Sequence, residues 1–277
     1  MKRIWLCKLS ALFLVIAFGI VPCWSQQTAP ASGVDPKADK LLRAMSDLMA
    51  NAKNVSFRTT EIHDRIRASG KKVQVKVARE GIVRRPDSVW IHAITHAPDR
   101  DRELSLWYDG KTLTYQSDKE KVYARTKVPP TIDETLDYIG DRLDTPTPMA
   151  DLLYSSPYDS YVAAEGTTGQ YVKTEKINNQ SCAQLAFQNP VVDFRLWVNE
   201  GKQPELCQLE ITYKFDEGKP KVVITFLEWN FAPQIAENTF IHTPPADYKK
   251  IKIIGSVELV QQPKEQQPQT QTQEQNR

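Results

Sequence analysis

The sequence predicts an α+β protein built on an antiparallel β-sheet, with one helix near the N-terminus and a helical block in the middle of the chain. Many short runs alternate apolar and polar residues between tight turns, as in strands with one dry face. Apolar residues instead follow helical spacing at 36–52 and again after residue 131. Because antiparallel strands need no crossover helix, the middle block is expected to pack on a face or an open end of the sheet.

The segment 181–231 has the most regular strand pattern. Three alternating runs are joined there by short turns, and the loop lengths predict a register. A two-residue turn sets Leu185 opposite Phe194, and a four-residue turn sets Leu196 opposite Cys207. Every such pair is apolar on apolar, so these residues are expected to share one dry face.

Strand signals also precede and follow the helical block. Asp109-Gly110 between two alternating runs is a strong hairpin signal. The segment 240–248 is Pro-rich and is expected to be extended. The expected strands cover 55–59, 73–77, 82–83, 89–94, 104–108, 113–116, 122–125, 171–177, 181–188, 192–198, 207–215 and 221–230.

The helices have recognisable start signals. Asp35-Pro36 places a capping carboxylate before a proline in the first turn, so one amphipathic helix is expected over 36–52. A capping box at 131–134 starts the middle block. Prolines at 146 and 148 end its first helix, and two shorter helices are expected before residue 163.

The two ends of the chain are expected to lie outside the folded domain. A basic start, an apolar core and small residues before Gln26 predict a cleaved signal peptide. The apolar run is short for a membrane span, and Pro22 disfavours processing for a lipid anchor at Cys23. The predicted order is a signal peptide over 1–25, a flexible leader over 26–35, a single domain over 36–250 and a disordered Gln- and Pro-rich tail over 261–277.

The signal peptide accounts for the positive charge of the chain. Of the 36 Lys and Arg residues, three lie in 1–25 together with no acid, which leaves 33 basic against 34 acidic residues in the mature chain. Without a net charge or a contiguous basic block, the sequence gives no electrostatic reason for nucleic-acid binding. No long apolar segment follows residue 25, so the mature protein is not expected to span a membrane.

Cys182 and Cys207 are the two thiols that remain after signal cleavage. Export and an even count favour a disulfide between them. The predicted register opposes it, because it places Cys207 on the dry face and Cys182 on the wet face of strands about 9–10 Å apart, whereas a disulfide needs Cα atoms within ~7 Å. A bulge would reconcile the two arguments, and the sequence leaves the bond open.

No motif in the sequence predicts catalysis, and no cofactor is implied. It contains no Gly-rich phosphate loop, nucleophile elbow or Cys-x-x-Cys. His92 and His96 are expected on one strand, where four residues span ~13 Å, too far to share a metal ion. The acids at 133, 134 and 137 are expected to complement a helix dipole. We therefore expect a non-enzymatic protein without a metal site.

The expected elements follow the order helix, strands, helical block, strands. Several motifs within this order give the chain a resemblance to known proteins. They are Arg84-Arg85-Pro86-Asp87, the run 107–113 with Tyr115 and 122–123, the run 149–154, and the run 193–198 with Gly201 and Pro204. Over roughly residues 36–246 the sequence resembles the periplasmic lipoprotein-carrier superfamily of LolA/LolB-like proteins. On 182–187 and the closing strand, it resembles more closely a family of predicted periplasmic proteins of unknown function in that superfamily.

The resemblance implies a periplasmic protein whose curved sheet is an unclosed half-barrel, with helices on the concave side as a lid over an apolar cavity. In the carriers, that cavity holds lipoprotein acyl chains. The first hypothesis is therefore a protein that binds a lipid, an acyl chain or another hydrophobic ligand. The expected lining residues are Phe187, Phe194, Leu196, Leu209, Ile211 and Tyr213 from the sheet, with Leu136, Ile139 and Leu153 from the lid.

The same residues would serve equally well in an ordinary packed core. The alternative hypothesis is therefore an envelope sensor or protein-interaction module with a filled core, whose partner is another envelope protein. A co-purifying lipid would separate the two hypotheses, because only the first predicts one.

Overall fold

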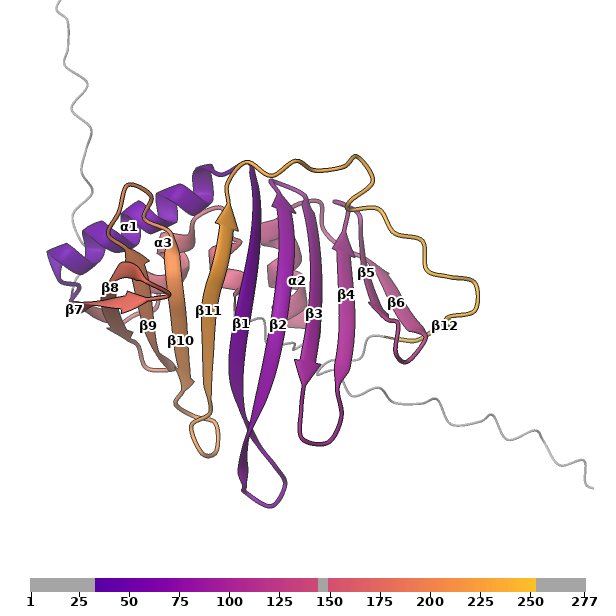
Figure 1. The fold of residues 1–277 in the computed structure, drawn as a ribbon, viewed down its shortest axis with the longest axis horizontal. Helices are drawn as coiled ribbons and strands as arrows, with labels where there is room; N and C mark the ends of the chain where they lie inside the picture. Colours follow the sequence, from indigo (N-terminus) through magenta and orange to yellow (C-terminus); the bar gives the residue numbers. More distant parts are fainter. Residues whose placement is uncertain (1–32, 144–148, 253–277) are drawn as a thin grey trace, which may run out of the picture.

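A single sheet of 12 strands dominates the computed structural model, which describes residues 33–143 and 149–252 (Figure 1). The predicted signal peptide, most of the predicted leader, the predicted tail, Pro146 and Pro148 lie outside the described residues. The strands are β1 (Asn54–Ile66), β2 (Lys72–Arg84), β3 (Ser88–His96), β4 (Arg102–Tyr108), β5 (Thr112–Ser117), β6 (Val122–Lys127), β7 (Thr168–Ile177), β8 (Gln180–Gln188), β9 (Val192–Asn199), β10 (Leu206–Tyr213), β11 (Lys221–Asn230) and β12 (Lys249–Lys250).

The chain builds the sheet as two antiparallel meanders that meet in the middle. The spatial order is β12-β6-β5-β4-β3-β2-β1-β11-β10-β9-β8-β7, so β11 returns to pair with β1. Only β12 joins its neighbour, β6, in parallel. The edge strands β12 and β7 lie at opposite ends of this order, and the sheet is curved and unclosed (Figure 1). The expected α+β half-barrel is confirmed.

The helices come from the predicted segments. They are α1 (Pro36–Asn51), α2 (Ile132–Leu143), the 3-10 helix η1 (Ala150–Leu152) and α3 (Pro157–Val162). At the start of α1, the Asp35 carboxylate accepts hydrogen bonds from the backbone N–H groups of Lys37 and Ala38. This cap satisfies two donors that the first turn leaves free.

All four helices contribute to one apolar core on the concave face of the sheet. Leu42 and Met45 of α1, Ile132 of α2, Leu152 of η1 and Tyr161 of α3 are buried there against inward-facing strand residues. Full burial of such a side chain stabilises the fold by about 1.5–3 kcal/mol. The helices therefore cover the concave side, as expected.

The register of β8, β9 and β10 differs from the predicted one by two residues. The β8–β9 turn is centred on residues 190–191, one residue later than predicted: the Asn189 N–H donates to the Val192 carbonyl at 3.1 Å, and the Asn189 side chain accepts from the N–H groups of Val191 and Val192. Leu185 consequently faces Leu196, and Leu196 faces Leu209. The predicted pairs were wrong, but a slip of two residues keeps every side chain on the same face, so the dry face was right.

The Cys182–Cys207 pair is joined in a disulfide across a β-bulge. The register of β9 and β10 shifts between Leu206 and Gln208, and Cys207 is the extra residue. The bulge takes Cys207 away from the apolar core into a small cluster with Cys182 and Trp197. The two Cα atoms are then 6.7 Å apart, within disulfide range. The expected position of Cys207 on the dry face opposite Leu196 was wrong, because a bulge reverses the alternation.

The C-terminal segment after β11 passes the ends of β1 to β4 and then pairs with β6 (Figure 1). Phe240 is buried, and the Arg84 guanidinium lies 4.7 Å from its ring centroid. His242 stacks on Trp107 with ring centroids 3.8 Å apart. This segment thereby covers part of the sheet that would otherwise expose large aromatic side chains.

Candidate functional site

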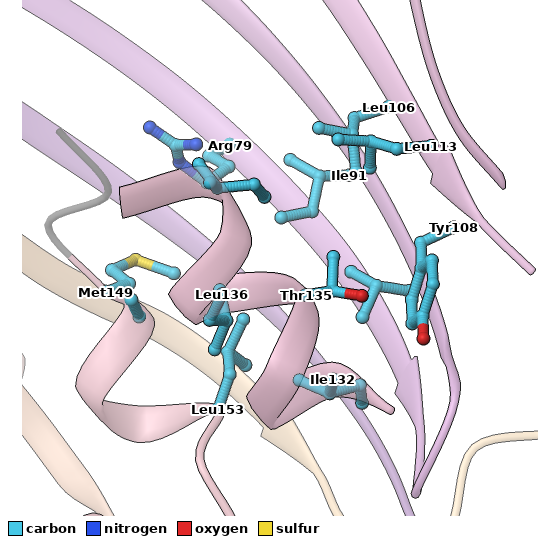
Figure 2. A pocket seen from close by; sticks show the side chains of 13 residues that line it. Arg79, Ile91, Leu106, Tyr108, Leu113, Ile132, Thr135, Leu136, Met149 and Leu153 are labelled. Carbon is cyan, nitrogen blue, oxygen red and sulfur yellow. The ribbon is translucent and has the colours of Figure 1, made fainter. Parts of the chain in front are cut away.

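An apolar cavity of about 130 Å³ lies between the first half of the sheet and the helical block. Figure 2 shows side chains from the strands pointing towards those of α2 and the segment around η1. The lining residues are Arg79, Val89, Ile91, Leu106, Tyr108, Leu113, Ile132, Thr135, Leu136, Ile139, Met149, Ala150 and Leu153. The volume is on the scale of ~150 Å³ apolar cavities that hold a benzene ring.

The polar lining groups are already satisfied by other partners. The hydroxyl groups of Tyr108 and Thr135 both donate to the backbone carbonyl of Pro129, at 2.8 and 3.0 Å. The Arg79 guanidinium is engaged by Glu61. The space between them is bounded mainly by aliphatic side chains. A hydrophobic group is what such a space can take.

Arg85 links the sheet to the lid, by which we mean α2, η1 and the residues up to 155 that follow η1. Its guanidinium donates from Nη1 to the Leu153 carbonyl and from Nη2 to the Leu152 carbonyl, the second at 3.3 Å. Burial lowers the pKa of Arg85, although the nearby Asp133 opposes that shift. Arg85 belongs to the Arg84-Arg85-Pro86-Asp87 motif, but no local signal in the sequence indicates that it reaches the lid.

Two carboxylates of α2 hold the segment that follows η1. The Asp133 carboxylate accepts from the Ser155 N–H at 3.0 Å and from the Ser155 hydroxyl at 2.6 Å. Asp137 accepts from the Tyr154 hydroxyl at 2.8 Å. The expectation that these acids serve only the helix dipole was incomplete, because they also join two pieces of the lid. α2 and η1 thus form one connected cover.

A buried ionic cluster lies beside the cavity. Glu61 is fully buried. Its Oε1 accepts a hydrogen bond from Arg79 Nε at 2.6 Å, and its Oε2 accepts from Arg79 Nη2 at 3.1 Å and lies 2.7 Å from His63 Nε2. Burial raises the pKa of Glu61, but the hydrogen bonds from His63 and Arg79 outweigh it and lower the pKa to about 2. The carboxylate is therefore ionised and neutralises the one arginine of the cavity wall.

The lid also carries a desolvated acid. Burial raises the pKa of Asp151 in η1 to about 6. Burial, and secondarily the negative charge of Asp151, raise the pKa of the Tyr161 and Tyr213 hydroxyl groups. The buried Tyr161 hydroxyl has no hydrogen-bond partner among the described residues. The underside of the lid therefore disfavours charge.

The structure separates the residues expected to line a site into two groups. Leu136, Ile139 and Leu153 lie in the cavity wall. The expected sheet residues Phe187, Phe194, Leu196, Leu209 and Ile211 are instead buried in the core of the other half of the sheet, with Tyr213 partly buried against them.

Aromatic packing shows that this second half is filled. Phe187 and Phe194 stack with centroids 5.1 Å apart, and Tyr161 of α3 lies 5.1 Å from Phe194. The sequence did not identify Val89, Ile91, Leu106, Tyr108 and Leu113 as wall residues, although their alternation was visible. Alternation shows which face of a strand is dry, but not where helices leave space above it.

The two histidines that invited a metal reading are used otherwise. His92 contacts Ser105 at 3.0 Å and Glu103 at 3.5 Å, and His96 contacts Asp101 at 3.2 Å. Within the part of the chain that the structure describes, no group of three or more His, Cys, Asp or Glu is arranged to hold a metal ion. Over the same residues, no helix is both long and apolar enough to span a membrane.

The fold and the site together place this protein in one structural class: a curved, unclosed sheet with an apolar cavity beneath a helical lid. The model of one family, described as "Predicted periplasmic protein (DUF2092)", matches residues 38–254. The chain belongs to this family, and the resemblance seen in the sequence is confirmed to that extent. No curated protein matches the chain.

Solved structures similar to this chain come from several bacteria. An uncharacterized conserved protein from Thermus thermophilus is 7% identical, with 78% of this chain and 99% of that chain covered and a TM-score of 0.44. Lipoprotein LppX of Mycobacterium tuberculosis is 12% identical, with 73% and 100% covered and a TM-score of 0.44. A LolA superfamily protein from Nitrosomonas europaea is 9% identical, with 74% and 97% covered and a TM-score of 0.34.

Proposed function

We propose that this protein binds a hydrophobic ligand, a lipid or a lipoprotein acyl chain, and that an apolar part of the ligand occupies the cavity between β3–β5 and the α2–η1 lid. The cavity itself supports this role most directly, because its walls are almost wholly aliphatic and its few polar groups already have partners. Burial of apolar surface would supply the binding free energy. The proposed role is binding rather than catalysis.

The size of the cavity indicates how a larger ligand would enter. At about 130 Å³ the cavity accepts a ring or a short stretch of chain, and a complete lipid would need more space, which movement of the lid would provide. The lid contacts the sheet through apolar packing and the Arg85 hydrogen bonds to lid carbonyls. Such contacts break without disturbing any strand pairing, so the sheet serves as a fixed wall and the lid as the movable one.

The proposed setting of this function is the periplasm. The family is described as periplasmic, and a signal peptide over 1–25 would direct export before the domain folds. The disulfide between Cys182 and Cys207 suits an oxidising compartment. Sequencing the N-terminus of the exported protein tests the cleavage before Gln26.

The first experiment is extraction and mass spectrometry of lipids from protein purified from the soluble periplasmic fraction. A lipid bound in stoichiometric amount is expected. The second is a titration with an apolar fluorescent probe, using Ala150→Leu to fill the cavity and Ala78→Leu, on an exposed position of β2, as the matched control. Ala150→Leu should weaken probe binding at least about tenfold, since overfilling a packed site costs about 1–3 kcal/mol.

The outcome that overturns the proposal is equally specific. A protein free of lipid that shows no saturable probe binding would favour the alternative, an interaction module with a filled core. Equal probe affinity in Ala150→Leu and Ala78→Leu would exclude the cavity as the binding site.

A further inference from the structure

Three loops meet at one end of the sheet and form what we call the hairpin rim: residues 65–72, 189–193 and 214–221. The Lys214 N–H donates to the Val191 carbonyl at 3.2 Å, and its ammonium donates to the Asn189 carbonyl at 2.7 Å. Asp64, beside the first loop, accepts from the Lys221 N–H at 3.2 Å and pairs with Lys72 at 3.2 Å. The β1–β2 and β10–β11 loops project beyond the sheet at the same end (Figure 1).

The rim exposes large apolar side chains. Phe215 is 78% exposed, the highest value for a large hydrophobic residue in the described part of the chain, and Val191 beside it is 56% exposed. Both stand on loops that the hydrogen bonds of Lys214 hold together. When a binding surface covers such exposed apolar side chains on a fixed loop, their removal from water favours association.

The rim is also basic, although the 33 basic and 34 acidic residues of the mature chain nearly cancel. Its three loops hold seven Lys and Arg residues against three acids, and Asp64 at their border adds a fourth acid, which leaves a net charge of +3. One of the acids, Asp193, is already paired with Lys214 at 2.7 Å. The neighbouring β3–β4 loop carries two acids and two arginines at 99–102, so it adds no net charge. The cations are Arg65, Arg67, Lys71, Lys72, Lys214, Lys219 and Lys221.

We propose that the hairpin rim docks on the surface of an anionic phospholipid bilayer, with Phe215 at the level of the headgroups and the surrounding cations facing lipid phosphates. A bilayer complements both features of the rim. Its negative surface potential attracts the cations, and the apolar interior immediately beneath that surface accepts the Phe215 side chain. A projecting tip with exposed apolar and basic side chains suits a deformable surface. Aromatic rings and basic side chains are the residues that favour this interface.

Docking at this end would be independent of the proposed ligand cavity. The rim lies at the loops of β1–β2, β8–β9 and β10–β11, whereas the cavity is lined by β2–β5, α2 and the η1 segment. The rim would bring the protein to a membrane whether or not the cavity is filled. The two proposals can therefore fail separately.

The test is co-sedimentation of the exported, soluble protein with vesicles of phosphatidylcholine alone and of phosphatidylcholine mixed with phosphatidylglycerol. The mixed vesicles are expected to bind at least about tenfold more tightly, and added salt should release the protein. Lys71→Gln/Lys72→Gln should weaken this binding at least about tenfold, since each cation near an anionic surface contributes about fivefold. Phe215→Ala should weaken it about tenfold through lost apolar burial.

Matched controls come from the other end of the sheet. Lys111→Gln/Lys127→Gln removes two exposed cations from the paired ends of β5 and β6, and Ile241→Ala removes a side chain that is 67% exposed in the C-terminal segment. Both controls, and the cavity variant Ala150→Leu, should bind vesicles as the unmodified protein does. Equal binding to both vesicle types, absence of binding, or equal losses in rim and control variants would overturn the proposal.

Discussion

Arg85 donates a hydrogen bond to the backbone carbonyl of Leu153, and this contact joins the end of β2 to the segment that covers the cavity. A guanidinium that holds main-chain carbonyls fixes the position of the lid whatever side chains the lid carries. Removing this contact should therefore change the closure of the lid without changing the stability of the sheet.

We expect Arg85→Leu to loosen the lid while the sheet stays folded. Hydrogen bonds from a charged donor contribute about 1.5–3 kcal/mol, so amide exchange should accelerate roughly tenfold or more across 150–154. Hydrogen–deuterium exchange measures this directly. Arg84→Leu is the matched control, because Arg84 contacts Phe240 and Ser88 rather than the lid. Unchanged protection at 150–154 in Arg85→Leu would show that the carbonyl contacts do not hold the lid.

We expect the half-buried Asp151 to contribute less stability as pH rises. Its pKa is raised to about 6 by burial, so the folded protein holds the proton more tightly than the unfolded chain does. The contribution of this group to stability is then greatest below the ordinary pKa near 3.8 and is lost as pH rises through about 6, by up to about 3 kcal/mol. Urea unfolding at a series of pH values measures the slope.

The variant Asp151→Asn should remove this slope and be more stable than the unmodified protein at pH 7. The aromatic groups that face Asp151, Tyr154, Tyr161 and Tyr213, stay neutral throughout this range because their pKa values are raised. An identical slope in Asp151→Asn would place the titrating group elsewhere.

The Glu61 cluster should act in the opposite direction at lower pH. The folded-state pKa of about 2 lies below the ordinary 4.5, so its contribution is complete above pH 4.5 and is lost as pH falls towards 2. The stabilisation lost over this pH range is about 3 kcal/mol. Glu61→Gln should destabilise the protein by about 3–5 kcal/mol at neutral pH, because it leaves Arg79 without its carboxylate.

A surface pair provides the control for this prediction. Arg58 and Glu228 form an ion pair with side chains that are 62% and 52% exposed, and Glu228→Gln should change stability by less than about 1 kcal/mol. If the two glutamine variants lose similar amounts, the buried cluster contributes no more than a surface contact. Chemical denaturation at neutral and acid pH gives both comparisons.

We expect loss of the Cys182–Cys207 disulfide to destabilise the second half of the sheet. The two residues are 25 apart in sequence, and closing a loop of that length stabilises a protein by about 3 kcal/mol in the chain-entropy model. Cys182→Ala/Cys207→Ala should show this loss in thermal unfolding, and a reducing agent should have no further effect on the variant. Two free thiols in the exported protein, found by mass spectrometry under non-reducing conditions, would contradict the bond.

The sequence alone determined the elements and the faces they bury. Helical spacing and the Asp35-Pro36 start predicted α1, and period-2 alternation predicted that Leu185, Leu196 and Leu209 share a dry face. These features depend on neighbours in the chain, because a strand's alternation and a helix's cap are local properties. Even the two-residue error in register left the faces correct.

Only the tertiary structure decided which part of the concave face is filled and which part is hollow. Phe187 and Leu113 have equivalent alternating patterns, yet the first is packed beneath α1 and α3 and the second lines the cavity beneath α2. The position of Cys207 likewise depended on a bulge. Each of these outcomes is set by how distant segments meet, since the volume between a lid and a sheet depends on the side chains of both.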